Sequence, residues 1–326
     1  MPRLVKSPAA SLDSMLRHCW LADDQRAAFA AAPFVPKAES VSEYLTPWLI
    51  AKRFDSSLIH RNAVFFQDEQ VTACLMNQAL EFIQRALCNT IAHYILAQKG
   101  LETWARVTNY YASYFSVHGL LCLQGRTFTR LQFAKPLMVH VVPIDFRNHV
   151  FGITDRHLGK NPHHETPWRR FYDIYDRYAV SHEAYEMVSR RAYVTDPADE
   201  SIERNMLNYT PFKGFSEIRD LARHKAFSSA FANYLADLKA RNTLAEFLAD
   251  LRAYASDPDH RYFARTLLKL ALAGDILLLI RAANHGIETE WITMIQRWKS
   301  LLATVFPNSA DCYLLKFVPL IGSGLN

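Results

Sequence analysis

The chain of 326 residues is 50% hydrophobic and 21% charged, a balance typical of globular proteins with a large core. Its formal net charge of +5 permits contact with phosphate groups but does not require it. Only 10 residues are glycine, and no Gly-x-x-x-x-Gly-Lys, Gly-x-Gly-x-x-Gly or Gly-x-Ser-x-Gly motif occurs. Nucleotide hydrolysis and dinucleotide redox chemistry are therefore disfavoured, and no cofactor is expected.

Cysteine usage and hydropathy predict a reducing, cytoplasmic location. The five cysteines are scattered without a Cys-x-x-Cys pair, which disfavours a disulfide framework and a thiolate zinc site. The N-terminal stretch lacks the long apolar segment of a secretory signal. The longest uncharged run, Val107–Gly125, contains Asn109, Ser113 and His118 and is too polar to span a membrane.

The first 125 residues are predicted to be helical. Residues 1–55 suggest short helices separated by prolines, one of them starting at Thr46-Pro47. Apolar residues recur at helical spacing over 68–99, and Gly100 is typical of a helix stop. A second long helix is predicted over 102–124. Because the turn at Gly100 is short, we expect the two long helices to pack as an antiparallel pair.

The second long helix carries a mainly aromatic face that we expect to be buried. This face comprises Trp104, Val107, Tyr111, Tyr114, Phe115, His118 and Cys122. His118 lies among apolar neighbours and is predicted to be a core histidine rather than a metal ligand.

From residue 127 to residue 153 the sequence becomes rich in β-branched and aromatic residues. Two such runs flank Arg147-Asn148, which predicts a hairpin, and Pro143 places its strand at an edge or a bulge. Further helices are predicted from Thr166 onwards. The clearest of them cover residues 216–241, 243–255 and the run that ends near 283.

The predicted fold class is mainly α, a multi-helix bundle with a small inserted β-hairpin or sheet element near 127–153. Three portions follow in chain order. Residues 1–125 form an N-terminal helical portion with the long helix pair, residues 126–165 form a basic β-like insert with a polar loop, and residues 166–326 form a C-terminal helical portion.

Positive charge is concentrated in the insert, where only Asp145 and Asp155 oppose it. These basic residues are candidates for contact with nucleic acid or with an acidic partner: Arg126, Arg130, Lys135, Arg147, Arg156 and Lys160.

A polar cluster directly after the predicted hairpin combines imidazole and carboxylate groups. Side chains of these types could hold a divalent metal ion that activates water, as in a metal-dependent nuclease. The candidate ligands are His157, His163, His164 and Glu165. The alternative is a solvated connecting loop without a metal.

The stretch from Asn109 to Leu121, with the sequence Asn-Tyr-Tyr-Ala-Ser-Tyr-Phe-Ser-Val-His-Gly-Leu-Leu, resembles the Tyr-Tyr-Ala helix of the HEPN superfamily. The resemblance covers residues 68–125. It implies a helical domain of bacterial phage-defence or toxin systems, in which active members are metal-independent ribonucleases that use an Arg and a His separated by four to six intervening residues. Among four such pairs, Arg219 and His224 are the best candidates, because a polar Asp220 follows Arg219 in a helical setting.

Three functions remain open at this point. The first is a helical intracellular interaction or nucleic-acid-associated subunit, such as one of a phage-defence or toxin-type system, with a protein partner or a second copy and with RNA or DNA as a candidate ligand. The second is a HEPN-like metal-independent endoribonuclease that uses Arg219 and His224. The third is a metal-dependent nuclease at the cluster from His157 to Glu165. No membrane partner is expected.

Overall fold

The computed structural model describes residues 2–6, 18–20, 22–32, 39–61, 63–155, 165–175, 199–209, 221–239, 244–255 and 260–281, together with residues 289, 293, 296, 297 and 300. Within these ranges the chain forms ten helices and five strands, so the prediction of a mainly helical fold with a small sheet is confirmed. None of the helices in these ranges is long and apolar enough to cross a bilayer.

The chain divides into two compact units that do not follow the order of the sequence. The first unit contains residues 1–82, 118–179 and 276–291, and the second contains residues 83–117, 180–275 and 292–326. The predicted β element belongs to the first unit. The sequence-based division into 1–125, 126–165 and 166–326 therefore describes chain order, whereas each compact unit combines three separate stretches.

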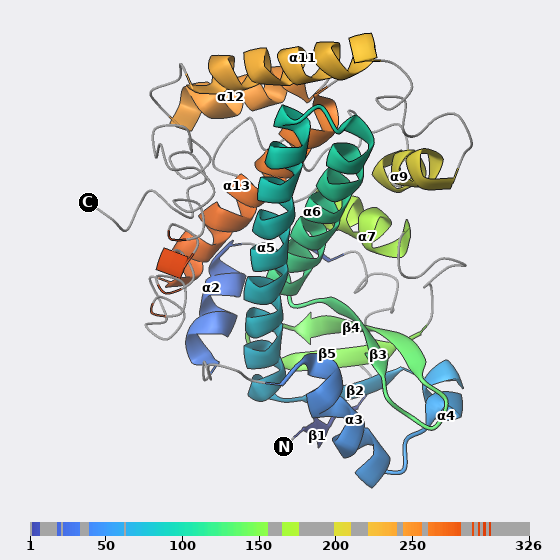
Figure 1. Cartoon of the computed structure of the whole chain (residues 1–326). Coiled ribbons are helices and arrows are strands. Elements are labelled where there is room, and N and C mark those ends of the chain that lie inside the picture. The colour runs from blue at the N-terminus through green and yellow to red at the C-terminus, as the bar shows by residue number, and fades with distance from the viewer. Residues whose placement is uncertain are drawn as a thin grey trace. The chain divides into compact units, whose positions relative to one another are not determined.

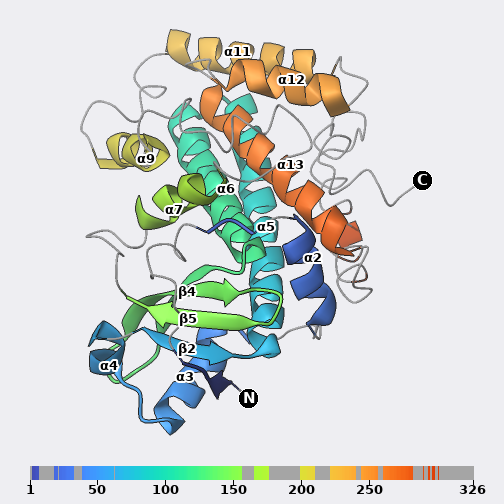
Figure 2. The ribbon, with the colours of Figure 1, turned by 180° about the vertical axis from the view of Figure 1, so that it is seen from behind.

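The two long helices form as predicted. Helix α5 covers Glu69–Gln98 and helix α6 covers Glu102–Leu123, and Figures 1 and 2 show them running side by side. The Asp68 carboxylate accepts a hydrogen bond from the backbone N–H of Gln70 (2.8 Å) and so caps the start of α5. At the other end Gly100 adopts a φ of 71° while the N–H of Leu101 reaches the carbonyl of Leu96 (2.9 Å), a turn that ends the helix.

The prediction of a buried aromatic face on α6 was partly wrong. Val107, His118 and Cys122 are buried, as expected. Trp104 is 50% exposed, and the side chains of Tyr111, Tyr114 and Phe115 are only partly covered. Small and polar residues, among them Ala105, Ala112 and Ser116, are fully or almost fully buried instead. The aromatic pattern pointed to the wrong face because small residues let helices approach closely, and this packing preference has no hydrophobic signature in the sequence.

All five strands of the first unit belong to one antiparallel sheet, with the order β1-β2-β5-β4-β3. Figure 2 shows its middle strands side by side. The strands are β1 (Arg3–Leu4), β2 (Val64–Gln67), β3 (Thr127–Leu131), β4 (Leu137–Asp145) and β5 (Val150–Thr154). The predicted hairpin is confirmed as β4 and β5, and the register shifts between Pro143 and Asp145, so the proline lies at a bulge. Strands β1 and β2 come from earlier in the chain than the predicted β element at 127–153. The sheet is therefore larger than the element that the sequence predicted.

A helix covers the β3 edge of the sheet. Helix α3 covers Val41–Ala51, and its Ser42 hydroxyl donates a hydrogen bond to the carbonyl of Arg130 (2.5 Å). The prediction that this helix starts at Thr46-Pro47 was wrong. Ser40 is the N-cap and forms a capping box with Glu43, and Pro47 lies inside the helix. The Ser-x-x-Glu pattern was present in the sequence and is a stronger start signal than the proline.

Three further helices complete the described part of the first unit. They are α2 (Ala22–Ala31), α4 (Ser56–Arg61) and α7 (Glu165–Tyr175). The Gln25 side chain of α2 donates a hydrogen bond to the carbonyl of Leu123, and the Tyr175 hydroxyl of α7 donates one to the carbonyl of Leu120. Both helices therefore satisfy backbone groups at the C-terminal end of α6.

The second unit is helical throughout its described residues. Besides parts of α5 and α6, it contains α9 (Asp199–Tyr209), α11 (Leu221–Lys239), α12 (Leu244–Tyr254) and the first part of α13 (Arg261–Arg281). Figures 1 and 2 show α11 and α12 side by side. The helices predicted over 216–241, 243–255 and up to 283 are confirmed within their described parts.

Candidate functional site

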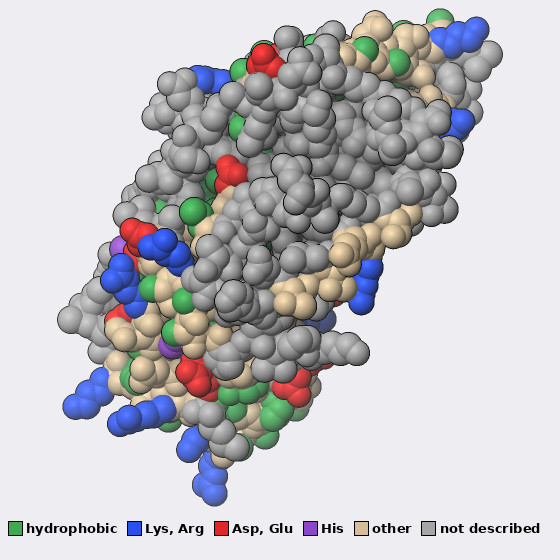
Figure 3. Space-filling model, turned by 90° about the vertical axis from the view of Figure 1, so that its left-hand side faces the viewer, with side chains coloured by type: hydrophobic (Ala, Val, Ile, Leu, Met, Phe, Trp, Pro, Cys, Tyr) green, Lys and Arg blue, Asp and Glu red, His purple; other side chains and the backbone are tan. Residues whose placement is uncertain are grey.

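The structure separates the basic residues that the sequence grouped together. Arg130 and Lys135 are exposed at the end of β3 and in the β3–β4 turn, whereas Arg147 lies in the turn after β4. Strand β4 has nine residues, so at about 3.3 Å per residue its two ends lie about 26 Å apart. That separation exceeds the Debye length of about 8 Å at physiological salt. The described basic residues of the insert therefore do not form one continuous patch, and Figure 3 shows Lys and Arg side chains interspersed with Asp and Glu on the face it draws.

Arg126 lies in the interior of the first unit. Its side chain is fully buried, and one guanidinium nitrogen donates a hydrogen bond to the carbonyl of His18 (2.6 Å). Burial, with a smaller contribution from the charge of Arg170, lowers the pKa of Arg126 to about 9. Arg126 therefore cannot contact a partner at the surface of the first unit. Arg147 is exposed but bonded to Asp24 (2.6 Å), and Arg156 and Lys160 lie outside the described residues.

The other predicted site residues fall largely outside the described residues. The residues outside the described ranges are Arg219, His157, His163 and His164. His224 lies within α11, and nothing further is described of its side chain. Glu165 begins α7 and lies 3.7 Å from Arg169. Among the described side chains, no group of three or more His, Cys, Asp or Glu residues could hold a metal ion.

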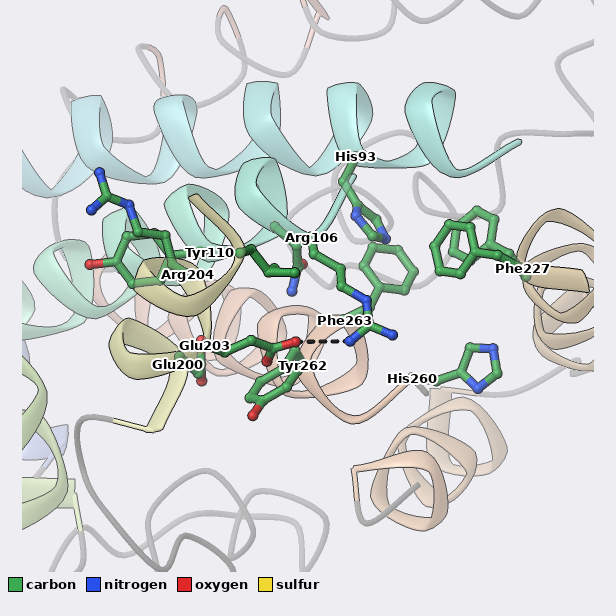
Figure 4. Close-up of a pocket in the computed structure, with 13 residues that line it drawn as sticks. His93, Arg106, Tyr110, Glu200, Glu203, Arg204, Phe227, His260, Tyr262 and Phe263 are labelled. Atoms are coloured by element: carbon green, nitrogen blue, oxygen red, sulfur yellow. Dashed lines mark hydrogen bonds and ion pairs between the residues drawn. The ribbon is translucent and has the colours of Figure 1, made fainter. Parts of the chain in front are cut away.

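The described part of the second unit contains a cleft lined by residues of five helices and by His260, just before α13. The empty space among its lining atoms, with the open mouth included, is about 530 Å³. Figure 4 shows the contact between Arg106 and Glu203 in the middle of the cleft, with aromatic rings on one side of it and Glu200 and Arg204 on the other. The rings are those of His93, Phe227 and Phe263. The lining residues are His93, Arg106, Asn109, Tyr110, Glu200, Glu203, Arg204, Leu207, Phe227, Phe231, His260, Tyr262 and Phe263.

An ion-pair layer forms the centre of the cleft. The Arg106 guanidinium bonds the carboxylate of Glu102 one turn earlier on α6 (2.9 Å) and the carboxylate of Glu203 on α9 (2.9 Å). Burial raises the pKa of Glu203, and the nearby Arg106 charge opposes that rise. The bonds from two helices hold the guanidinium in one orientation. Arg106 therefore acts as a fixed part of the wall rather than as a mobile cation.

A second ion pair lies at the Glu200 side of the cleft and is fully buried. The Lys269 ammonium on α13 donates hydrogen bonds to Glu200 Oε1 on α9 (2.5 Å) and to the Ser113 hydroxyl on α6 (2.6 Å). Lys269 is 1% exposed and Glu200 is 5% exposed. Burial lowers the pKa of Lys269, and the contact with Glu200 opposes that effect. The pair ties three helices together in the low-dielectric interior of the unit.

The tautomer of His93 follows from its hydrogen bond. His93 Nδ1 lies 2.7 Å from the carbonyl oxygen of Ala105, and a carbonyl can only accept, so Nδ1 carries the proton. Burial lowers the pKa of His93 to about 4, so the ring is neutral near pH 7. Nε2 therefore presents a lone pair and can only accept a hydrogen bond.

Aromatic rings line the other end of the cleft and fix its shape. The His93 ring lies 4.4 Å from the Phe263 ring at an interplanar angle of 31°, and Phe231 meets it edge-on at 5.4 Å. Behind them Tyr234 stacks on His260 at 4.8 Å. Such contacts hold the rings in place at this end of the cleft.

Several residues of the lining carry a buried polar atom with no hydrogen-bond partner within the described part of the chain. Four of these atoms are His93 Nε2, Glu200 Oε2, Arg106 Nε and the side-chain oxygen of Asn109. Buried polar atoms left without a partner cost about 1–3 kcal/mol each. The first two are fixed acceptors, the third is a fixed donor, and the Asn109 amide can serve as either.

Charges around the cleft are nearly balanced. Besides the two ion pairs, Arg265 lies 3.7 Å from Asp199, and the Tyr262 hydroxyl donates a hydrogen bond to Asp199 and accepts one from Arg261. A bare phosphate group would meet carboxylates here, and a divalent cation would meet arginines. The charges of the lining therefore favour neither a bare phosphate group nor a divalent cation.

Comparisons with known proteins add no further constraint: the sequence matches no family model, no curated protein and no solved structure. The resemblance of Asn109–Leu121 to the HEPN superfamily therefore stays a prediction. Sequence reasoning did not identify His93, Arg106, Glu200 or Glu203 as site residues. One signal was available, because Lys269 interrupts the apolar run from Leu267 to Ala273, and a lone charge in such a run indicates a buried partner.

Proposed function

We propose that the protein is a helical, nucleic-acid-associated binding subunit and that the cleft of its second unit receives one unstacked nucleobase. The observation that carries the proposal is the combination of aromatic residues in the lining with buried polar atoms that lack partners in the described chain. Proteins recognise unpaired bases by stacking them on aromatic rings and by hydrogen bonding to their edges. Stacking contributes about 1–3 kcal/mol per base, so hydrogen bonds to the edge of the base would have to supply the remainder of the roughly 4 kcal/mol that millimolar binding requires.

The balance of charges supports a base rather than a phosphate as the group inside. Arg106 is engaged by Glu102 and Glu203, and Lys269 is engaged by Glu200, so neither of these cations is available to neutralise a phosphate. Because the polar atoms are covered in the free protein, a base reaches them as side chains at the mouth change rotamer and ordered water leaves. Movements of this size are common when ligands bind.

Calorimetric titration of the full chain with nucleosides tests this proposal. We expect saturable binding of at least one nucleoside, and Asn109→Leu or Phe263→Ala should weaken it about tenfold or more through loss of an edge contact or a stacking surface. Thr108→Val is the matched control for Asn109→Leu, because its hydroxyl bonds the carbonyl of Trp104 within α6 and lies outside the cleft lining. Absence of binding to all common nucleosides would contradict the proposal.

A second candidate function, contact with nucleic acid or an acidic partner at the β3–β4 turn, is favoured by the exposure of Arg130 and Lys135. We expect the double variant Arg130→Ala/Lys135→Ala to weaken binding of single-stranded RNA or DNA. The slope of log affinity against log salt should fall by about one unit for each phosphate that is no longer neutralised. Arg147→Ala is the control, because that guanidinium is engaged by Asp24. An unchanged affinity and slope in the double variant would exclude the turn as a binding surface.

Catalysis remains a proposal that rests on the sequence alone. A HEPN-like ribonuclease that uses Arg219 and His224 should cleave RNA in the presence of EDTA, and His224→Ala should abolish the cleavage. A metal-dependent nuclease at His157, His163, His164 and Glu165 should instead lose its activity when the metal is chelated. Membership of a phage-defence or toxin-type assembly would be supported by co-purification of a protein partner or a second copy.

A further inference from the structure

We propose that a basic surface at one end of the sheet in the first unit binds an acidic segment of a protein partner, with Ile50 as its apolar contact. This inference rests on the second candidate function, since it names the kind of partner that the β3–β4 turn would take. The surface comprises the side chains of Lys52, Arg53, Arg130 and Lys135 together with Ile50.

Helix α3 runs beside strand β3 toward the turn. The Ser42 hydroxyl donates a hydrogen bond to the carbonyl of Arg130 (2.5 Å), and one helical turn later the Thr46 hydroxyl oxygen accepts one from the backbone N–H of Gln132 (3.2 Å). Residues four apart lie on the same face of a helix, so Ile50 continues this row by about 6 Å. Gln132 is the first residue after β3, so the row leads from the strand to the turn.

Exposed cations lie in the turn and directly after the helix. Arg130 and Lys135 belong to the end of β3 and to the turn, and Lys52 and Arg53 follow the last residue of α3. All four side chains are exposed, and none forms a hydrogen bond or an ion pair with a described residue. Their charges are therefore available to a partner.

The described carboxylates near this surface are engaged or lie at its far side. Asp55 accepts a hydrogen bond from a backbone N–H of α4 (3.0 Å), and Asp155 contacts His60. Glu39 and Glu43 lie at the start of α3, about 12 Å along its axis from the end of the helix. The part of the surface near the turn therefore keeps a positive charge that an anionic partner can neutralise.

Arg53 occupies a backbone position at which the chain elsewhere uses glycine. The N–H of Phe54 bonds the carbonyl of Leu49 (2.9 Å), and Arg53 between them adopts a φ of 60°. The same hydrogen-bonded turn ends α5 and α6, and there the residue with the positive φ is Gly100 or Gly125. Glycine is the less strained choice at such a position, so a role for the side chain rather than for the backbone favours Arg there.

Ile50 favours a protein partner over nucleic acid. Its side chain is 54% exposed in the row that leads to the turn, two residues before Lys52. Protein interfaces combine an apolar centre with a polar rim, whereas a phosphate backbone is bound by cations and other hydrogen-bond donors. A segment that carries Asp or Glu side chains around an apolar one matches both the charge and the exposed Ile50.

Labelled peptides test the apolar contact, with fluorescence anisotropy of the full chain as the measurement. A peptide of repeated Glu-Glu-Leu triplets should bind at least about threefold more tightly than polyglutamate of the same length, because only the first brings an apolar side chain to Ile50. Ile50→Ser should lower this ratio to about one. Leu4→Ser is the matched control, because Leu4 is 45% exposed on β1, at the edge of the sheet opposite β3.

Charge variants test the basic part of the surface. Arg130→Ala/Lys135→Ala and Arg53→Gly should each weaken binding of the Glu-Glu-Leu peptide about threefold or more at low salt, and the difference should shrink as salt rises. Arg53→Lys keeps the charge and should retain most of the affinity. Arg147→Ala controls for net charge, because that guanidinium is engaged by Asp24. Since glycine relieves the backbone, Arg53→Gly should not lower the midpoint of thermal unfolding.

The outcomes separate this inference from the function on which it rests. Peptide binding that responds to Ile50→Ser and to both charge variants, but to neither control, supports it. A labelled oligouridylate that binds more tightly than the peptide and ignores Ile50→Ser overturns the acidic protein partner and leaves nucleic-acid contact at the turn in place. A response to Arg130→Ala/Lys135→Ala alone overturns the contribution of α3. A lower midpoint with unchanged affinity in Arg53→Gly overturns the role of Arg53. If no ligand responds to Arg130→Ala/Lys135→Ala, the inference and the second candidate function fail together.

Discussion

The interiors of the two units are stabilised in different ways. The sheet of the first unit packs large apolar rings, and Phe66, Phe146 and Phe151 are all fully buried there. The second unit instead buries the complementary charges of Lys269 and Glu200 beside a cleft. Apolar burial is a direct source of stability, whereas a buried ion pair contributes little or nothing relative to well-packed apolar side chains. The stability of the second unit should therefore be more sensitive to removal of a single charge than that of the first.

Removing one member of the buried pair should have the largest effect. Lys269→Met leaves Glu200 charged, buried and without its counter-ion, and we expect it to lower the free energy of unfolding by about 3–5 kcal/mol. The double variant Lys269→Met/Glu200→Gln should recover most of that loss, because no isolated charge remains. Urea denaturation of both variants measures the difference. A loss below about 1 kcal/mol in Lys269→Met would show that the pair is hydrated rather than buried.

Acidification should destabilise the second unit through His93. The pKa of the buried His93 ring is about 4, against an ordinary value of 6.5. Between these two pH values the imidazole is protonated in the unfolded chain and neutral in the folded chain. The contribution of His93 to stability is therefore complete above pH 6.5 and is lost as the pH falls through 4. A difference of this size corresponds to about 3 kcal/mol.

The variant His93→Asn isolates this contribution. An Asn side chain can still donate a hydrogen bond to the carbonyl of Ala105, but it does not titrate. Chemical denaturation at intervals between pH 7 and pH 4 should therefore show a shallower loss of stability in His93→Asn than in the wild type. Parallel curves for the two proteins would mean that His93 is solvated.

Glycine substitutions test how tightly the first unit is packed. Gly125 has a φ of 71°, and an added Cβ would lie 2.9 Å from the Phe146 ring, so Gly125→Ala combines backbone strain with a steric clash. We expect a loss of roughly 2–3 kcal/mol. At Gly152 an added Cβ would lie 3.1 Å from the Phe65 ring without a positive φ, so Gly152→Ala should cost less. Thermal denaturation of the two variants compares the effects, and a larger loss at Gly152 would contradict this ranking.

The fold was predictable wherever the signals are local. Gly100 ends α5, apolar spacing gives the lengths of α5 and α6, and Pro143 lies at the bulge of the hairpin, all as the sequence indicated. Each of these features depends on residues within a few positions of one another. The burial of Trp104 was mispredicted because the face that a helix buries depends on what packs against it.

The cleft could not be predicted because it depends on contacts between distant segments. Glu203 reaches Arg106 across 97 positions, and Lys269 reaches Ser113 across 156 positions. Nothing in the local sequence around His93 shows that its Nδ1 bonds Ala105 or that Phe263 stacks against it. The spatial arrangement of the described basic residues was likewise not predictable from their order in the chain, because the two ends of β4 are separated by the length of the strand.

The smallest effect should come from removing an exposed ion pair, the one between Arg147 and Asp24. Arg147 bonds Asp24 at 2.6 Å in the first unit, which is as short as the contacts of Lys269, but its side chain is 57% exposed. Water screens both charges and solvates either one when its partner is removed, so Arg147→Ala should change the free energy of unfolding by less than about 1 kcal/mol. Denaturation at low and high salt measures this change, and most of any loss should vanish at about 1 M salt. A loss comparable to that of Lys269→Met would mean that bond length, rather than burial, sets the stability of these pairs, and the contrast between the two units would no longer hold.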